Sequence, residues 1–393
     1  MRQQMVFWCL CVVMSPTWAA EDRDAFLSRS SESFSAYEER AKEFLETHKE
    51  WVEEANSIQE VAAVMPFELR PDPEKCLASQ KVGVLLSHGL SDSPFSMRDP
   101  ALALQAACYQ VRVILLPGHG TRSADLLTVD EDDWRDAFQQ AADTFQKEVD
   151  VMYVGGFSTG GALAAEYAWQ NPQSVAGVIL FSPLFKINSS IDWLSPMLSY
   201  FKDWLDNYPT DDFAKYASIP VPAIASAYRL AKDVRNSLLD NPQAIPVFMA
   251  LSEDDQTVDS SVSKAVFDEA MVSSKSQMLL YSRLQSNANT DRVRIYNTNW
   301  PQRQILGLSH MAIHGDPENT YYGEHGSYRI CSWYLEESSK YQACRTDHAN
   351  WFGEKSDALL EKSDHAARIS WNPNFDSLMK QVANFIEATA DLR

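Results

Sequence analysis

Short apolar runs alternate along this chain with longer segments in which apolar residues recur every three or four positions. The short runs are rich in Val, Ile and Leu, which is typical of buried strands, whereas the longer segments have the period of amphipathic helices. The predicted strands cover residues 81–87, 111–116, 151–154, 175–181, 245–251, 278–281, 293–296 and 305–308. Strands and helices that alternate at this spacing predict an α/β fold with a doubly wound, mostly parallel sheet.

Three segments depart from this alternation. Residues 22–65 are polar with one apolar stripe at helical spacing, and they predict a helical arm within residues 20–73. We expect the arm to pack its stripe on the main domain, residues 74–393; a lid or a dimerisation element is the alternative. Residues 183–243 predict an inserted helical cap, in which residues 197–208 have the apolar spacing of an amphipathic helix, and residues 311–373 form a polar insertion before the final helix.

The predicted strand that starts at Val151 ends in a G-x-S-x-G pentapeptide, Gly156–Gly160. The residues after it, from Ala162 to Ala168, are good helix formers. A serine at a sharp turn between a strand and a helix has an exposed hydroxyl, and the turn directs the first N–H groups of the helix toward a bound group. Ser158 is therefore the candidate nucleophile, although the pentapeptide also fits a simple glycine-rich turn.

A serine hydroxyl needs a base to take its proton, usually a histidine that a carboxylate orients. The sequence offers both after Ser158, in the order Ser, Asp, His, and each follows a predicted strand. We assign Asp255 as the acid and His310 as the base. Asp254 and His314 are the competitors. Asp255 is preferred because a D-x-x-V turn leads from it into the next helix.

Cleavage of an acyl bond also needs hydrogen-bond donors for the oxyanion of the tetrahedral intermediate. The candidates are the backbone N–H groups of Thr159, after the nucleophile, and of Leu90, in the loop after the first core strand. A metal site at His310, His314 and Asp316 is a weak alternative, since the glutamate of the H-E-x-x-H motif is missing. We therefore expect neither a metal nor a cofactor.

The 393-residue chain has a net charge of −20 and no basic block. Nucleic acids and anionic membranes bind Lys/Arg patches, so we expect neither as a partner. Residues 1–19 have a basic start, an apolar stretch too short to span a membrane and small residues before a cleavage point, which predicts a secretory signal peptide. We expect an exported protein, periplasmic or secreted, without stable membrane insertion.

Four cysteines follow the predicted signal peptide, and an even number in an exported protein predicts two disulfides. Cys76 precedes the first core strand, and Cys108 ends the helix that returns to the same edge of the sheet. Cys331 and Cys344 close a short loop in the insertion. We therefore predict the pairs Cys76–Cys108 and Cys331–Cys344.

The run from Val82 to Ala168 resembles the α/β-hydrolase superfamily, and most of all its bacterial monoacylglycerol lipase and carboxylesterase branch. The matching pieces are His88-Gly89, Pro117–Gly120, Asp132–Trp134, the pentapeptide around Ser158, residues 245–258 and Ser309-His310. The resemblance implies serine-dependent ester hydrolysis without a cofactor. The N-terminal arm and the insertion after His310 depart from the family's pattern.

We therefore expect a serine hydrolase that cleaves carboxylic esters through an acyl-enzyme on Ser158, with acyl lipids as the leading substrate class. The cap is rich in aromatic residues: Trp193, Tyr200, Phe201, Trp204 and Tyr208. These predict an apolar pocket around the nucleophile and a preference for medium acyl chains over acetate. A serine aminopeptidase or acyltransferase on the same fold is one alternative, and a non-catalytic binding protein is another.

Overall fold

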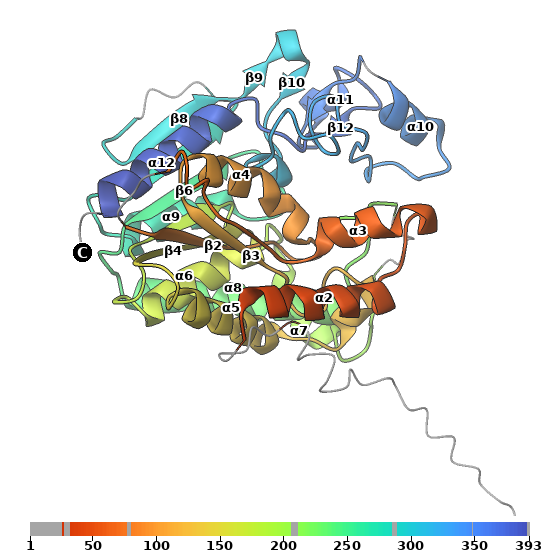
Figure 1. The fold of residues 1–393 in the computed structure, drawn as a ribbon. Coiled ribbons are helices and arrows are strands. Elements are labelled where there is room, and N and C mark those ends of the chain that lie inside the picture. Colours follow the sequence, from red (N-terminus) through yellow and green to blue (C-terminus); the bar gives the residue numbers. More distant parts are fainter. Residues whose placement is uncertain are drawn as a thin grey trace, which may run out of the picture.

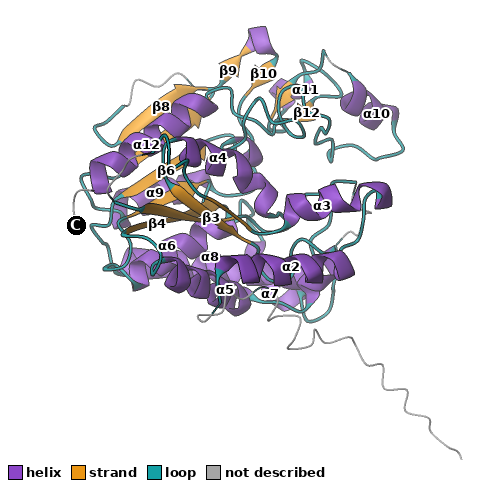
Figure 2. Cartoon of the chain, viewed as in Figure 1, coloured by secondary structure: helices purple, strands orange, loops and turns teal. Residues whose placement is uncertain are grey.

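The computed structural model describes residue 26 and residues 32–76, 80–205, 211–284, 289–347 and 349–390. The predicted signal peptide, residues 1–19, lies outside the described residues. Within the described part of the chain, an eight-stranded sheet forms the centre of the molecule, and helices cover both of its faces (Figures 1 and 2).

The strand order in the central sheet is β1-β3-β2-β4-β5-β6-β7-β8. Neighbouring strands pair in parallel except β1, which lies antiparallel to β3 at the edge. The strands are β1 Phe67–Leu69, β2 Val82–Ser87, β3 Gln110–Ile114, β4 Val151–Phe157, β5 Gly177–Phe181, β6 Val247–Ser252, β7 Gln277–Ser282 and β8 Val293–Asn297. This is the doubly wound, mostly parallel sheet of the α/β-hydrolase fold, so the expected fold class is confirmed.

The helices divide between the two faces of this sheet, and each face has its own apolar core. One face is covered by α5 Glu131–Phe145, α6 Thr159–Gln170, α8 Val221–Asp240 and α9 Ser260–Ala270, and the other by α4 Arg98–Ala106 and α12 Phe375–Ala390. The helix α5 begins at a capping box between Asp130 and Asp133, and it buries Trp134 completely. The strands β2, β4, β5 and β6 are buried along almost their whole length, which fixes the positions of their carboxyl ends.

The N-terminal arm consists of α2 Phe34–His48, the 3-10 turn η1 Glu54–Asn56 and α3 Ser57–Val64. The apolar stripe of α2 is buried as expected, with Phe34, Tyr37, Ala41 and Leu45 inside. The stripe does not continue through the arm, because the helix stops at His48 and Ile58 of α3 is 81% exposed. The buried carboxylate of Glu60 accepts the N–H groups of Val52 and Glu53, and these bonds stabilise the turn between the two helices.

The cap contains the 3-10 turn η4 Asp192–Leu194, the short helix α7 Ser195–Leu198 and the long helix α8. The expected helix over residues 197–208 is wrong, since α7 ends at Leu198. Tyr200 and Phe201 are each 85% exposed and Trp193 is 60% exposed. These side chains therefore do not enclose the apolar pocket that the sequence suggested, and Tyr208 lies outside the described residues.

A second, four-stranded sheet in the order β12-β11-β10-β9 joins the segment before His310 to the insertion after it. The segment before His310 supplies β9 Asn299–Trp300, the 3-10 turn η5 Pro301–Arg303 and β10 Ile305–Leu306. The insertion supplies α10 Ser339–Thr346, β11 Phe352–Gly353, α11 Asp357–Leu360 and β12 Ala367–Arg368. The strand expected at residues 305–308 belongs to this sheet and not to the central one. The insertion lies beside the central sheet, at the upper right of Figure 1.

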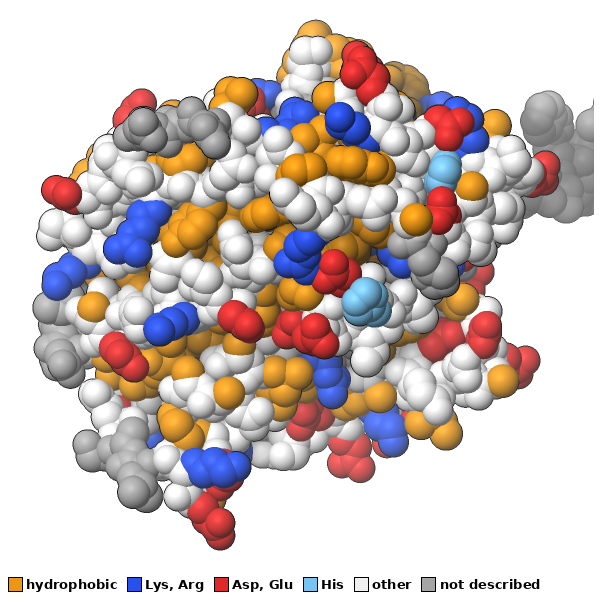
Figure 3. Space-filling model, turned by 90° about the horizontal axis from the view of Figure 1, so that it is seen from above, with side chains coloured by type: hydrophobic (Ala, Val, Ile, Leu, Met, Phe, Trp, Pro, Cys, Tyr) orange, Lys and Arg blue, Asp and Glu red, His pale blue; other side chains and the backbone are white. Residues whose placement is uncertain are grey.

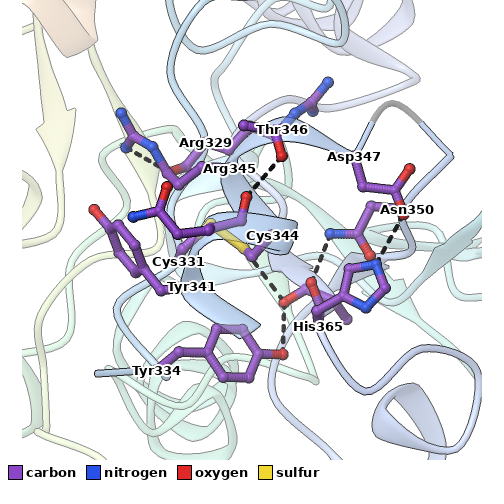
Figure 4. The surroundings of a disulfide bond; sticks show 12 residues. Arg329, Cys331, Tyr334, Tyr341, Cys344, Arg345, Thr346, Asp347, Asn350 and His365 are labelled. Atoms are coloured by element: carbon purple, nitrogen blue, oxygen red, sulfur yellow. Dashed lines mark hydrogen bonds and ion pairs between the residues drawn. A yellow bond between two sulfur atoms is a disulfide. The ribbon is translucent and has the colours of Figure 1, made fainter. Parts of the chain in front are cut away.

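Both predicted disulfides are confirmed: Cys76 bonds Cys108, and Cys331 bonds Cys344. The second disulfide joins the loop after η6 His310–Ala312 to α10 across thirteen residues (Figure 4). Next to it, the Tyr334 hydroxyl donates to the carbonyl of Ala366, 3.0 Å away. The disulfide therefore stabilises the insertion after His310, which has few helices and strands of its own.

The surface shown in Figure 3 carries Lys and Arg side chains interspersed with Asp and Glu, and no continuous basic area. None of the helices in the described ranges combines the length and the apolar character needed to cross a membrane.

Candidate active site

The candidate nucleophile lies on a tight turn between β4 and α6. Ser158 has φ 52° and ψ −114°, a conformation that non-glycine residues rarely adopt. Gly156 and Gly160 make the turn possible, because a Cβ at either position would lie within 2.5 Å of the Ser87 carbonyl oxygen. The Ser158 N–H donates to the carbonyl of Phe181 at 3.0 Å, so the strained turn is fixed to the neighbouring strand β5.

The acid and base candidates meet at the same edge of the sheet. Asp255 follows β6, and its Oδ1 atom accepts the N–H groups of Thr257 at 2.7 Å and Val258 at 2.9 Å. Its Oδ2 atom lies 2.6 Å from Nδ1 of His310, the first residue of η6. Both side chains are buried. A carboxylate can only accept, so Nδ1 carries the proton and Nε2 is left as the basic nitrogen.

Asp254 and His314, the competing candidates for the acid and the base, have different bonding partners from Asp255 and His310. The Oδ1 atom of Asp254 lies 2.5 Å from Nε of Arg283, in an ion pair. His314 is buried, and no carboxylate in the described part of the chain bonds to its ring. Burial is the main cause that lowers the pKa of His314 to about 3, and the charges of His310 and Lys215 contribute to this shift. The geometry therefore pairs Asp255 with His310.

The ring of Phe157 connects the nucleophile turn to the histidine, with its centroid 4.6 Å from that of His310. The Nε2 atom of His310 is buried and has no hydrogen-bond partner among the described residues, so the Ser158 hydroxyl does not hydrogen-bond to it in this conformation. Catalytic hydrogen bonds of this kind are often formed only when a substrate is bound.

The two oxyanion candidates lie next to Ser158, Thr159 in sequence and Leu90 in the loop after β2. Thr159 is the first residue of α6, where the N–H groups have no acceptor within the helix. Leu90 follows Gly89, and a Cβ added to Gly89 would lie 3.1 Å from the Cβ of Ser158. The loop after β2 therefore lies so close to the candidate nucleophile that a side chain at position 89 would crowd Ser158.

Two buried histidines hold this loop in place. His88 accepts the N–H of Leu116 at Nε2, 3.1 Å away, and His119 accepts the N–H of Ser91 at Nε2, also at 3.1 Å. The Nδ1 atom of each ring lies 2.9–3.0 Å from a backbone carbonyl. Burial lowers the pKa of both rings, to about 4 for His119, which keeps them neutral.

Sequence reasoning used His88 and His119 only as parts of the family resemblance and gave them no role. The sequence did contain a signal for such a role, because each histidine lies next to a glycine in a loop at the end of a strand. The contact between them, with ring centroids 5.0 Å apart, joins residues thirty-one positions apart and cannot be read from spacing.

The structure gives no support to the metal alternative at His310, His314 and Asp316. No group of three or more His, Cys, Asp or Glu side chains in the described ranges is arranged to hold a metal ion. The Nδ1 atom of His310 is bonded to Asp255, and Oδ1 of Asp316 accepts the N–H of Glu318 at 2.8 Å.

Comparison with known proteins finds similarity in the first part of the sheet. The family described as serine aminopeptidase, S33, matches residues 78–207. A thermostable monoacylglycerol lipase of Bacillus sp. (strain H-257) is 32% identical over 111 residues, which are 28% of this chain and 42% of the lipase. The chain thus aligns with less than half of the length of this relative.

Solved structures with similar folds include lipolytic enzymes. A structure of the metagenome-derived lipolytic enzymes LipS and LipT has 24% identity and a TM-score of 0.49, and the match covers 56% of this chain and 86% of that one. A soluble variant of monoglyceride lipase from Saccharomyces cerevisiae has 17% identity and a TM-score of 0.46, with 56% and 82% covered. The family match, the sequence relative, which is a lipase, and the sheet topology agree on an α/β-hydrolase fold.

Proposed function

We propose that this protein is an exported serine hydrolase that cleaves carboxylic esters through an acyl-enzyme on Ser158. The observation that carries the proposal is the buried bond of 2.6 Å between Asp255 and His310, beside a serine on a strained turn between a strand and a helix. A structural role would not need this combination of groups at one sheet edge.

In the proposed reaction, the Ser158 hydroxyl attacks the ester carbonyl while Nε2 of His310 takes its proton. Asp255 keeps Nδ1 protonated and stabilises the imidazolium ion that forms. The backbone N–H groups of Leu90 and Thr159 stabilise the negative charge on the carbonyl oxygen. His310 then gives its proton to the departing alcohol, and a water molecule releases the acid from Ser158 by the same steps in reverse.

Two observations support the remaining parts of the proposal. The disulfides Cys76–Cys108 and Cys331–Cys344 are typical of proteins from oxidising compartments, which favours export. The similarity to a monoacylglycerol lipase favours an acyl lipid as the substrate. The family described as serine aminopeptidase makes amide hydrolysis the second candidate.

Labelling with a fluorophosphonate probe, together with p-nitrophenyl esters of graded chain length, tests the proposal. We expect the wild-type protein to react with the probe at Ser158 and to hydrolyse the esters faster than an aminoacyl p-nitroanilide. A higher kcat/KM for the anilide would assign the aminopeptidase activity. If the folded protein neither reacts with the probe nor cleaves any substrate, the remaining hypothesis is a non-catalytic binding protein.

A further inference from the structure

The proposed acid and the proposed base come from two different sheets. Asp255 follows β6 of the central sheet, whereas the strand before His310, β10, belongs to the second sheet. The strand β6 pairs with β5 and β7, and β10 pairs with β9 and β11. Contacts outside the strands must therefore set the distance between the carboxylate and the imidazole ring.

One buried hydroxyl joins the loop before His310 to the turn that carries Asp255. Ser252, the last residue of β6, is fully buried. Its Oγ atom donates to the carbonyl of Leu308 at 2.6 Å and accepts the N–H of Asp254 at 3.2 Å. A hydroxyl can donate and accept at the same time, so this single group bonds to both loops.

A second buried hydroxyl joins the residue before His310 to the end of the insertion. Ser309 is fully buried, and its hydroxyl donates to the carbonyl of Ile369, the residue after β12. On the other side of η6, the carbonyl of Ile313 accepts the side-chain amide of Asn372 at 2.9 Å. The end of the insertion therefore holds the turn that carries the histidine on both sides.

The backbone of the loop before His310 passes very close to the neighbour of the proposed acid. Gly307 has φ 83°, and a Cβ at this position would lie 2.5 Å from Oδ2 of Asp254. The N–H of Gly307 donates to the carbonyl of Thr298 at 2.9 Å. The loop can approach this closely because position 307 has no side chain.

The relative position of the two loops matters for the chemistry. The carboxylate of a Ser-His-Asp set acts by holding the imidazole in the correct tautomer and orientation. A displacement of about 1 Å in an active site can lower the rate about 100-fold. If the hydroxyl that bonds to both loops is removed, Asp255 and His310 can move relative to each other even when each loop keeps its own fold.

We propose that Ser252 and Ser309 are positioning residues for the proposed base, and that together they fix His310 relative to Asp255. Ser252 ties the base to the central sheet, and Ser309 ties it to the insertion. The inference rests on the proposed function and adds to it two residues that act through the catalytic pair. The insertion after His310 is therefore part of the architecture of the active site.

The variant Ser252→Ala and a matched control test this inference. Ser276→Ala removes another fully buried serine, whose Oγ atom accepts the N–H of Val247 at 3.1 Å, at the opposite end of β6. Each variant loses one buried hydrogen-bond partner of the same strand, so we expect similar falls in melting temperature. We expect kcat on p-nitrophenyl octanoate to fall at least about tenfold in Ser252→Ala and to stay within about twofold of the wild type in Ser276→Ala, with KM unchanged in both.

Two further measurements separate positioning from substrate binding. The rate constant for labelling of Ser158 by a fluorophosphonate depends on the same histidine, so it should fall in Ser252→Ala by about the same factor as kcat. The Nδ1–H proton of His310, identified by its absence in His310→Gln, can be followed by NMR without any substrate. Its resonance should shift or broaden in Ser252→Ala and stay unchanged in Ser276→Ala.

The outcomes are distinct. Equal losses of kcat in Ser252→Ala and Ser276→Ala would mean that the serine acts on stability alone, and a raised KM with unchanged kcat would mean that it acts on substrate binding. Either result overturns the inference. If Ser252→Ala does not fold, Ser309→Ala with the same control decides the question. Full activity in both serine variants overturns the inference and leaves the proposed function standing, whereas a wild type that neither reacts with the probe nor cleaves the ester refutes the proposed function itself.

Discussion

Ser158 has a strained backbone and a small side chain, and it is 5% exposed at the edge of the sheet. In Ser158→Ala the glycines of the turn remain, and the lost atom is a hydroxyl that carries no packing role. We expect ester hydrolysis to fall by at least about 1,000-fold, as for other catalytic serines, with the melting temperature nearly unchanged. The measurement is kcat on a p-nitrophenyl ester beside a thermal melt. Activity within tenfold of the wild type would remove Ser158 from the proposed mechanism.

His310 and His314 lie four positions apart in the sequence, and both rings contact Phe157, with centroids 4.6 Å and 4.3 Å away. They differ in their partners: within the described part of the chain, His310 bonds a carboxylate, that of Asp255, and His314 does not. His310→Gln should therefore lower kcat by at least about 1,000-fold, because a catalytic set acts as a unit, whereas His314→Gln should lower it by less than about tenfold. The two variants are matched controls for each other. The reverse ranking would move the base to His314.

At the scale of secondary-structure elements, the arm depends on one buried carboxylate. Glu60 of α3 is 3% exposed, accepts the N–H groups of Val52 and Glu53, and lies 3.8 Å from Nζ of Lys49. Glu60→Ala would leave two N–H groups and a buried ammonium without this partner. We expect the free energy of unfolding to fall by about 3 kcal/mol, measured by urea denaturation.

The control for the arm is Glu46→Ala, which removes an exposed carboxylate of α2 that lies 3.5 Å from Lys42. Surface ion pairs contribute little, so we expect a change below about 1 kcal/mol. Equal effects of Glu60→Ala and Glu46→Ala would mean that the arm is held by its apolar stripe alone.

The core strands were predictable because they are buried on both faces, and such strands are continuous apolar runs in the sequence. The edge strand β1 was missed, since three half-buried residues with Glu68 in the middle leave no such run. The strand before His310 was predicted but placed in the wrong sheet, because an apolar run indicates that a strand is buried and does not indicate which strand it pairs with. The prediction of a helix over residues 197–208 was wrong for a related reason. Helical spacing shows which side chains would share a face, but it does not show whether the protein has a surface on which that face can pack.

At the scale of the whole molecule, the sequence was informative about the proposed catalytic groups and silent about the contacts that hold them together. Ser158 follows β4 and Asp255 follows β6, and parallel strands bring their carboxyl ends to one edge, so the approach of these two residues follows from topology. His310 follows a strand of the second sheet, and its bond to Asp255 does not follow from the order of the central strands. That bond depends on contacts such as that between Ser252 and Leu308, which are 56 positions apart. No periodicity indicates a contact of that kind, because it results from the way the second sheet lies beside the central one.

Acid sensitivity is a property of the whole fold to which His314 contributes in a calculable way. Its pKa is about 3 in the folded protein, because of burial, and about 6.5 in the unfolded chain. The unfolded state therefore binds more protons, and the stability that His314 contributes is complete above pH 6.5 and is lost as the pH falls toward 3. Between pH 7 and pH 5 this loss amounts to about 2 kcal/mol.

The non-titrating variant His314→Gln isolates this contribution, because every other buried group, including His88 and His119, is common to both proteins. Urea denaturation at pH 7 and pH 5 should show a fall in the free energy of unfolding that is about 2 kcal/mol smaller in His314→Gln than in the wild type. The wild type therefore loses about 2 kcal/mol more stability than the variant between pH 7 and pH 5, whatever their difference at pH 7. An identical pH dependence in both would mean that the His314 ring takes up its proton without unfolding, and that water reaches it beside Phe157.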